Sequence, residues 1–212
     1  MMKAFVFLFL TASISNSFSA EVDEKRAWFG VFSRKENKEN SLISHQELQL
    51  RYNLETGSNQ QLLIRFGILK PITKFHELGF LFGFIEGGEI KEYRPTLQHV
   101  YSHQDDEYRF LLRSRMEWRD WEDERSNSIR YRLQIQLNYT LTNKNTIVVW
   151  DEPFLNISTN KLSGNQLLER NRAFIGIRFP ISGHNLEAGY LNQFIPRQSD
   201  LTEHIAVIYL YF

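Results

Sequence analysis

Hydrophobic and polar residues alternate with a period of two along most of the chain from about residue 41 onward. In the clearest segment, 107–119, one parity is apolar except for Ser114, and the other is charged except for Leu111. Segment 128–141 repeats the pattern, with Ile, Leu and Tyr on one parity and Arg, Gln and Asn on the other. A strand separates two such sets onto opposite faces, whereas a helix would mix them around its circumference.

The same reading predicts ten strands in all. They lie near residues 41–52, 60–69, 75–86, 93–101, 107–119, 128–141, 145–157, 169–179, 185–193 and 201–212. Turn-forming residues separate them, and short connections alternate with longer ones. This alternation is typical of a barrel whose two rims face different compartments. We therefore expect an all-β fold, a transmembrane antiparallel up-and-down β-barrel over residues 41–212.

Segment 26–34 complicates the strand count. With it, the chain would have about eleven strands, and single-chain bacterial barrels have an even number. We therefore expect about ten spanning strands, with twelve as the alternative, and place 26–34 at the rim or in the lumen. Residues 20–40 are predicted to form an N-terminal segment with a possible short strand.

The start of the chain has the pattern of an export signal. Lys3 precedes an apolar run from Ala4 to Leu10, which leads into mainly small and polar residues ending in Ser17-Phe18-Ser19-Ala20. This predicts a cleaved signal peptide over residues 1–19. No later apolar run is long enough for a transmembrane helix, and the chain has no cysteine. The formal net charge of zero argues against nucleic acid as a partner.

Alternation alone does not separate a membrane barrel from a soluble one, which also alternates but with its apolar face inward. Two features favour the bacterial outer membrane. The last predicted strand ends in Phe212, as expected of an assembly signal read by the barrel-assembly machinery. Tyr108 and Trp118 bracket an apolar row roughly 25 Å tall, and Tyr131 and Tyr139 bracket one of roughly 20 Å. Such rows fit aromatic girdles in contact with outer-membrane lipid.

The other parity of the strands is rich in arginine and glutamate. Turning these arginines to lipid would cost up to about 2–4 kcal/mol each near the midplane, so the register is strongly specified. Guanidinium and carboxylate groups at close quarters form bidentate hydrogen bonds. We therefore expect a polar network in the lumen, made of Glu47, Arg51, Arg65, Glu92, Arg94, Arg109, Arg113, Arg115, Glu117, Arg130, Arg132, Glu152, Arg172 and Glu187.

Three functions stay open from the residues alone. The first is a structural or interaction barrel with a filled lumen that works through its external loops. The second is a narrow channel or a binding site for a small anionic solute, because the inward rows carry a basic excess. The third is a lipid-modifying hydrolase, since His99 and Ser114 share the outer parity of neighbouring predicted strands. No nucleophile motif accompanies them, so no catalytic residue is assigned and we expect a protein that is not an enzyme.

Metal binding has a weak basis in the sequence. His99 and His103 are four residues apart, which in a strand separates their side chains by about 13 Å. That distance is too large for the two imidazoles to share one ion. We therefore expect no metal site and no cofactor.

Several short stretches, spread in order over most of the chain, resemble a bacterial family known as domain of unknown function 2490. They are residues 61–67, 92–94 with Gln98, 113–119, 130–133, 151–152 with 154–156, 171–172 with Gly176, and 187–191. The resemblance implies an outer-membrane barrel and no established activity. Pro95 departs from the family pattern. Because proline cannot donate a hydrogen bond to a neighbouring strand, the middle of the strand predicted near 93–101 is expected to be interrupted.

Overall fold

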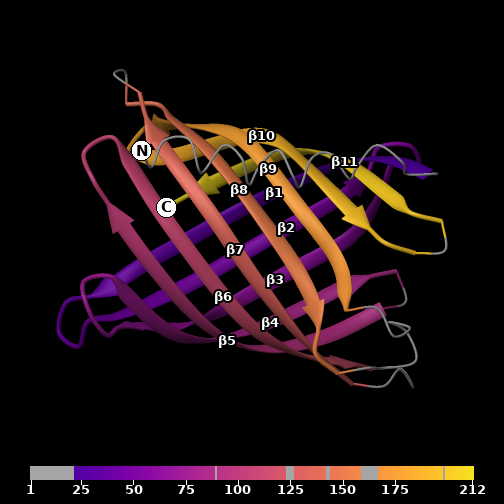
Figure 1. Ribbon diagram of the computed structural model, residues 1–212, viewed down its shortest axis with the longest axis horizontal. Coiled ribbons are helices and arrows are strands. Elements are labelled where there is room, and N and C mark those ends of the chain that lie inside the picture. Colours follow the sequence, from indigo (N-terminus) through magenta and orange to yellow (C-terminus); the bar gives the residue numbers. More distant parts are fainter. Residues whose placement is uncertain (1–21, 89, 123–126, 142–143, 159–166, 198) are drawn as a thin grey trace.

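The protein is described by a computed structural model that covers residues 22–88, 90–122, 127–141, 144–158, 167–197 and 199–212. Over these residues the strands close into one barrel (Figure 1). The strands are β1 (Val22–Asn37), β2 (Leu42–Asn53), β3 (Ser58–Pro71), β4 (His76–Gly87), β5 (Ile90–Gln104), β6 (Tyr108–Trp121), β7 (Ser128–Thr140), β8 (Thr146–Asn156), β9 (Leu168–Ile181), β10 (His184–Ile195) and β11 (Leu201–Tyr211). The predicted signal peptide, residues 1–19, lies outside the described residues. In the described part of the chain, no helix is long and apolar enough to cross a membrane.

The predicted all-β barrel is confirmed, but its strand number and closure differ from expectation. The described residues form eleven strands, not ten or twelve. Segment 26–34 is neither at a rim nor loose in the lumen, because it lies inside β1 and pairs with strands on both sides. The barrel therefore begins at Val22 rather than at residue 41.

The closing pair explains how an odd number is possible. β1 runs parallel to β11, from Val22 opposite Leu201 to Phe32 opposite Tyr211, while all other neighbouring strands are antiparallel. An even count is needed only when the first and last strands close the barrel in antiparallel fashion. β1 also has the alternation of a wall strand, since Trp28 is buried whereas Phe29 and Val31 are more than 40% exposed.

The two rims of the barrel differ in their connections. At one rim, here called the turn rim, residues 38–41, 72–75, 105–107, 141–145 and 182–183 join successive strands. At the opposite loop rim, connections reach eleven residues, at 157–167. The two-residue connection of the turn rim, Ser182-Gly183, has positive φ at both residues, as a type I′ hairpin requires. Because eleven strands start and end at opposite rims, β1 begins at the loop rim and Phe212 lies at the turn rim.

Proline interrupts the sheet without ending the strand that contains it. Pro95 lies within β5, opposite Phe82 of β4. The pairing of β5 with β6 omits Arg94 and Pro95 and resumes at Thr96. The missing N–H of proline accounts for this local gap.

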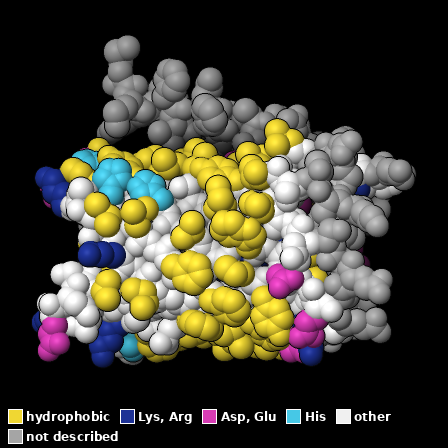
Figure 2. All heavy atoms as spheres, turned by 90° about the horizontal axis from the view of Figure 1, so that it is seen from below, with side chains coloured by type: hydrophobic (Ala, Val, Ile, Leu, Met, Phe, Trp, Pro, Cys, Tyr) yellow, Lys and Arg dark blue, Asp and Glu magenta, His cyan; other side chains and the backbone are white. Residues whose placement is uncertain are grey.

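The outer face of the barrel carries large apolar side chains. Phe66, Phe80, Leu78 and Leu97 are each at least half exposed on β3, β4 and β5. Figure 2 shows one side of this outer face, where hydrophobic side chains cover the middle and charged side chains gather towards the two ends. The strands therefore present an apolar band between two polar rims.

The inner face carries an apolar cluster among its charged side chains. Strands β1 and β8–β11 contribute one buried apolar cluster, made of Trp28, Val148, Trp150, Phe174, Leu191, Ile205, Val207 and Tyr209. Phe174 stacks on Trp150, with 5.1 Å between ring centroids, and lies over the backbone of Gly176 and Gly189. A Cβ at either glycine would come within 2.6 Å of the Phe174 ring. Charged side chains of the same strands, among them Arg172 of β9 and Glu187 of β10, line the lumen beside this cluster.

Candidate binding site in the barrel lumen

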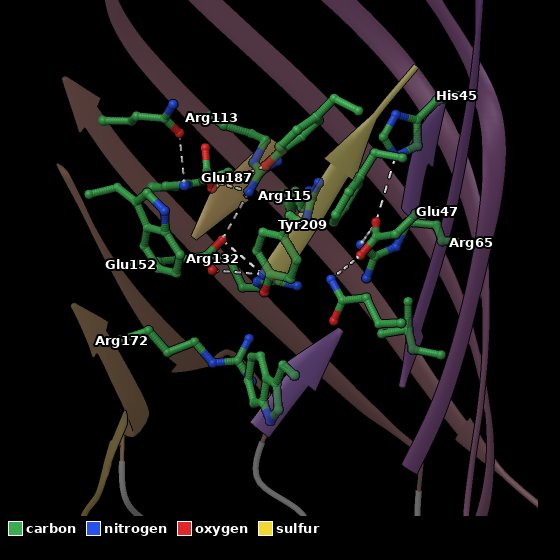
Figure 3. Close-up of a pocket in the computed structure, with 18 of the residues that line it drawn as sticks. His45, Glu47, Arg65, Arg113, Arg115, Arg132, Glu152, Arg172, Glu187 and Tyr209 are labelled. Atoms are coloured by element: carbon green, nitrogen blue, oxygen red, sulfur yellow. Dashed lines mark hydrogen bonds and ion pairs between the residues drawn. The ribbon is translucent and has the colours of Figure 1, made fainter. Parts of the chain in front are cut away.

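The barrel encloses a cavity of about 520 Å³ whose lining is dominated by arginine (Figure 3). Four glutamates also line it: Glu47, Glu92, Glu152 and Glu187. The thirteen arginines are Arg34, Arg51, Arg65, Arg94, Arg109, Arg113, Arg115, Arg119, Arg130, Arg132, Arg170, Arg172 and Arg178. The structure thus brings thirteen of the fourteen predicted lumen residues to one cavity, and the remaining one, Glu117, is fully buried beside it.

Ion pairs between neighbouring strands lock the charged wall. Arg65 of β3 donates to Glu47 of β2 at 2.6 Å. Glu117 of β6 accepts hydrogen bonds from two arginines of β7, at 2.5 Å from Arg130 and 2.7 Å from Arg132. These pairs are directly opposite or diagonal in the sheet, so the backbone register itself places them in contact.

A second network lies towards the loop rim. Arg119 donates to Glu92 at 2.7 Å, and Glu169 accepts hydrogen bonds from Arg130 at 2.9 Å and from Arg170 at 2.7 Å. These contacts join β5 to β6 and β7 to β9, the second pair over the intervening β8.

The turn rim has fewer ion pairs. Arg178 donates to Glu187 at 2.6 Å, and the Tyr211 hydroxyl donates to the same carboxylate at 3.2 Å. Tyr209 and Tyr211 therefore point into the lumen, while Ile208 is 44% exposed on the outer face. The sequence alone leaves this orientation open, because apolar residues occupy both parities of the last strand.

The charges around the cavity do not balance. Three glutamates outside the lining also pair with its arginines: Glu77, Glu117 and Glu169. Seven carboxylates therefore oppose thirteen guanidiniums, an excess of six positive charges among the described residues. Four arginines have no ion pair with any described residue: Arg51, Arg109, Arg115 and Arg172.

Glutamine side chains orient three of the four arginines that lack an ion pair, namely Arg51, Arg115 and Arg172. The Gln98 side-chain oxygen accepts from Nε of Arg115 at 2.6 Å, and that of Gln193 accepts from Nε of Arg172 at 2.5 Å. Arg51 donates to Gln61 at 2.5 Å. In each pair the two residues are direct cross-strand neighbours. Arg113 and Gln134 form a fourth pair of this kind, although Arg113 also lies 3.8 Å from Glu152.

Aromatic rings support the same guanidinium groups. The Trp28 ring centroid lies 4.1 Å from the guanidinium carbon of Arg51 and 4.8 Å from that of Arg172. The Phe154 centroid lies 4.3 Å from that of Arg132 and 4.6 Å from that of Arg172. Cation–π contact stabilises a guanidinium without cancelling its charge. Sequence, register and packing therefore combine to keep free positive charge inside the barrel.

The predicted girdle residues all point outward and fall at the two ends of their strands. Tyr108 lies directly opposite Tyr139 near the turn rim. Towards the loop rim, Tyr131 lies opposite Met116, and Trp118 follows Met116 by two residues in β6. Trp118 is 44% and Tyr139 43% exposed. Their role at a membrane interface stays a prediction.

Phe212 closes the last strand at the turn rim. Its backbone N–H donates to the Phe32 carbonyl at 2.8 Å, and its ring centroid lies 4.5 Å from that of His184. The side chain is 53% exposed. Its role as an assembly signal stays a prediction.

His99 and Ser114 are direct cross-strand neighbours on the outer face, as their parity predicts. The hydrogen bond of His99 is to another imidazole, since its Nε2 lies 3.0 Å from Nδ1 of His76. Among the described residues, no three His, Cys, Asp or Glu side chains form a group that could hold a metal ion.

Comparison with known proteins identifies the family of the chain. The model of the family described as "Protein of unknown function (DUF2490)" matches residues 25–204. The chain belongs to this family. A search of curated proteins finds no match for this DUF2490 chain. A solved structure titled "NanC porin structure in rhombohedral crystal form" is similar in fold, with a TM-score of 0.55 and 9% sequence identity, over 83% of this chain and 89% of that chain.

Several residues of this DUF2490 lumen escaped the sequence prediction. Arg170 and Arg178 share the parity of Arg172 in β9, so the period of two was a signal that could have found them. Arg34 required β1 to be recognised as a wall strand. The glutamines were harder to find, because their role depends on which residue lies across the sheet: Gln61, Gln98, Gln134 and Gln193.

Proposed function

We propose that this DUF2490 chain forms a bacterial outer-membrane barrel whose lumen binds small anions and lets them pass. The observation that carries the proposal is the charge around the cavity, where thirteen guanidiniums oppose seven carboxylates. Clefts lined by one sign of charge concentrate ions of the opposite sign. A cavity of about 520 Å³ suits a small solute rather than a polymer.

The wall of the barrel supports the membrane placement. Large apolar side chains such as Phe66 and Phe80 are exposed in the middle of the outer face. In this placement the aromatic residues near each rim contact the lipid interface, and the turn rim with Phe212 faces the periplasm, because periplasmic turns are short. The barrel-assembly machinery would read the last strand.

The cavity lining extends towards both rims. Arg109 and Phe212 line it near the turn rim, while Arg119 and Arg170 line it near the loop rim. An anion entering from either side therefore meets guanidinium groups along the whole lining. This arrangement favours passage over a pocket open at one end only.

Reversal potentials in planar bilayers test the proposal. Across a KCl gradient, we expect the potential to have the sign of chloride selectivity. Reversing one unpaired charge, with Arg109→Glu, should reduce that selectivity. Lys70→Glu makes the same charge change on an exposed side chain outside the lumen and should leave it unchanged. Cation selectivity, or no current at any salt concentration, would overturn the conduction proposal.

The network at the loop rim favours a second candidate. The contacts of Glu92 and Glu169 with Arg119 and Arg130 link four side chains in the barrel interior into one network. A barrel filled at this level would be closed to solutes and would work through its external loops as a structural or interaction protein. Absence of current together with an intact, heat-modifiable barrel is the result that this second candidate predicts.

A further inference from the structure

We infer that the lumen holds a site for a small anion with two negative charges, such as phosphate, sulfate or a short dicarboxylate, formed by Arg51, Arg115 and Arg172. The inference rests on the proposed anion-binding role of the lumen. It adds the charge class of the ligand and the residues that select it. Four observations carry it.

The first observation is burial without a counter-charge. The residue exposures of Arg115 and Arg172 are 3% and 7%. Each donates one hydrogen bond, through Nε, to a glutamine. Their terminal Nη groups bond to no described residue. A buried charge without an ionic partner is strongly disfavoured, so a ligand that supplies negative charge here would be bound.

The second observation is the choice of glutamine where the same barrel elsewhere uses glutamate. Arg65 and Arg130 lie opposite Glu47 and Glu117 and form ion pairs with them. The corresponding neighbours of Arg115 and Arg172 are Gln98 and Gln193. An amide oxygen orients a guanidinium as a carboxylate does, but it leaves the positive charge available. The glutamines therefore hold the guanidinium groups in place while leaving their positive charge available to bind an anion from solution.

The third observation is convergence. Arg51 and Arg172 share the Trp28 ring, so their guanidinium carbons lie within about 9 Å of each other. Arg172 and Arg132 share the Phe154 ring and are equally close. Arg115 is the direct cross-strand neighbour of Arg132, and Figure 3 shows Arg115 and Arg132 pointing into the same cavity.

The fourth observation concerns the two glutamates of the lining that lie near this group, Glu47 and Glu152. Glu152 accepts from Arg132 at 2.8 Å and Glu47 from Arg65 at 2.6 Å, so neither forms an ion pair with the three arginines of the site. Three guanidiniums without an ion pair of their own therefore line one region of the lumen. Coulomb attraction grows in proportion to ligand charge, so this region favours a divalent anion over a monovalent one of similar size.

Calorimetric titration of the detergent-folded full chain tests the site directly. We expect sulfate, phosphate or malonate to bind at least tenfold more tightly than acetate or chloride. Tighter binding of sulfate and phosphate than of malonate would indicate a site for inorganic oxyanions. Tighter binding of malonate would indicate a site for dicarboxylates. Binding of all three divalent anions no tighter than acetate would overturn the inference.

Matched variants locate the site. Gln98→Glu keeps side-chain size but places a carboxylate against Arg115, so it should weaken divalent-anion binding at least tenfold. Gln104→Glu makes the same change at an exposed position outside the cavity lining and should have no effect. Equal binding by both variants and the parent would contradict the assigned residues. The parent titration decides the ligand class even if a variant fails to fold.

The two proposals can fail separately. Tight sulfate binding without current would refute conduction and keep the site. Chloride-selective current with no preference for divalent anions would keep the proposed function and refute this inference.

Discussion

Glu152 of β8 and Arg172 of β9 lie directly opposite each other in the sheet, but their side chains bond to different partners. Glu152 accepts hydrogen bonds from Arg132 at 2.8 and 2.9 Å, and Arg172 donates its Nε proton to Gln193. The Arg172 guanidinium instead lies between the rings of Trp28 and Phe154. The carboxylate of Glu152 thus lies on the strand next to Arg172 but is bonded to Arg132. Arg172 is therefore left without an ion pair.

Removing the Glu152 charge should strengthen anion binding. Glu152→Gln retains a hydrogen-bond acceptor for Arg132 but deletes the negative charge nearest to Arg113. We expect sulfate to bind several-fold more tightly, and the chain to lose about 1–3 kcal/mol of stability because a charge-assisted bond becomes a neutral one. Titration and urea unfolding in detergent measure the two effects. Weaker sulfate binding in this variant would contradict the electrostatic account of the lumen.

Glu117 should be the most important single carboxylate for stability. It has no exposed surface and bonds to Arg130 and Arg132 at once. Glu117→Ala leaves two buried guanidiniums short of a partner and should cost about 3–5 kcal/mol.

The midpoint of urea unfolding in detergent checks this expectation for Glu117. The control is Glu77→Ala, which breaks the pair with Arg34, whose side chain is 42% exposed. We expect that change to cost about 1 kcal/mol or less. Equal losses in the two variants would show that burial of the ion pair has no effect on stability.

A charged side chain on the outer face should destabilise the barrel more in the middle of the apolar band than near a rim. Phe66 lies near the middle of β3, and Leu78 lies two residues from the start of β4 at the turn rim. Phe66→Arg should destabilise the barrel in lipid vesicles by about 2–4 kcal/mol, whereas Leu78→Arg should cost about 0–1 kcal/mol. Reversible unfolding in vesicles provides the measurement. A larger penalty at Leu78 would be inconsistent with an outer face in lipid.

The two rims should differ in accessibility on intact cells. An epitope inserted within residues 54–57 would lie at the loop rim, and one inserted within residues 38–41 would lie at the turn rim. We expect antibody to label the first insertion on whole cells and the second only after the outer membrane is opened. The opposite labelling pattern would reverse the proposed orientation.

Alternation in the sequence was sufficient to predict ten of the eleven strands, and the inward parity of those in which apolar and polar residues alternate clearly. Arg109, Arg113 and Arg115 share one parity, and the structure places all three in the cavity lining. The strand count could not be obtained in this way. It depends on the pairing of β1 with β11, whose members, such as Val22 and Leu201, are far apart along the chain and carry no local signal of parallel pairing.

Where apolar and polar residues alternate clearly, the sequence by itself determined which side chains face the lumen, because a strand turns successive residues to opposite faces whatever its neighbours are. Only the tertiary structure decided which inward residues touch. The barrel register sets Gln98 against Arg115 and Gln193 against Arg172, and it sets Glu47 against Arg65. Cross-strand contact depends on how strands from distant parts of the chain align. The division of the arginines into neutralised and free groups is therefore a property of the closed barrel.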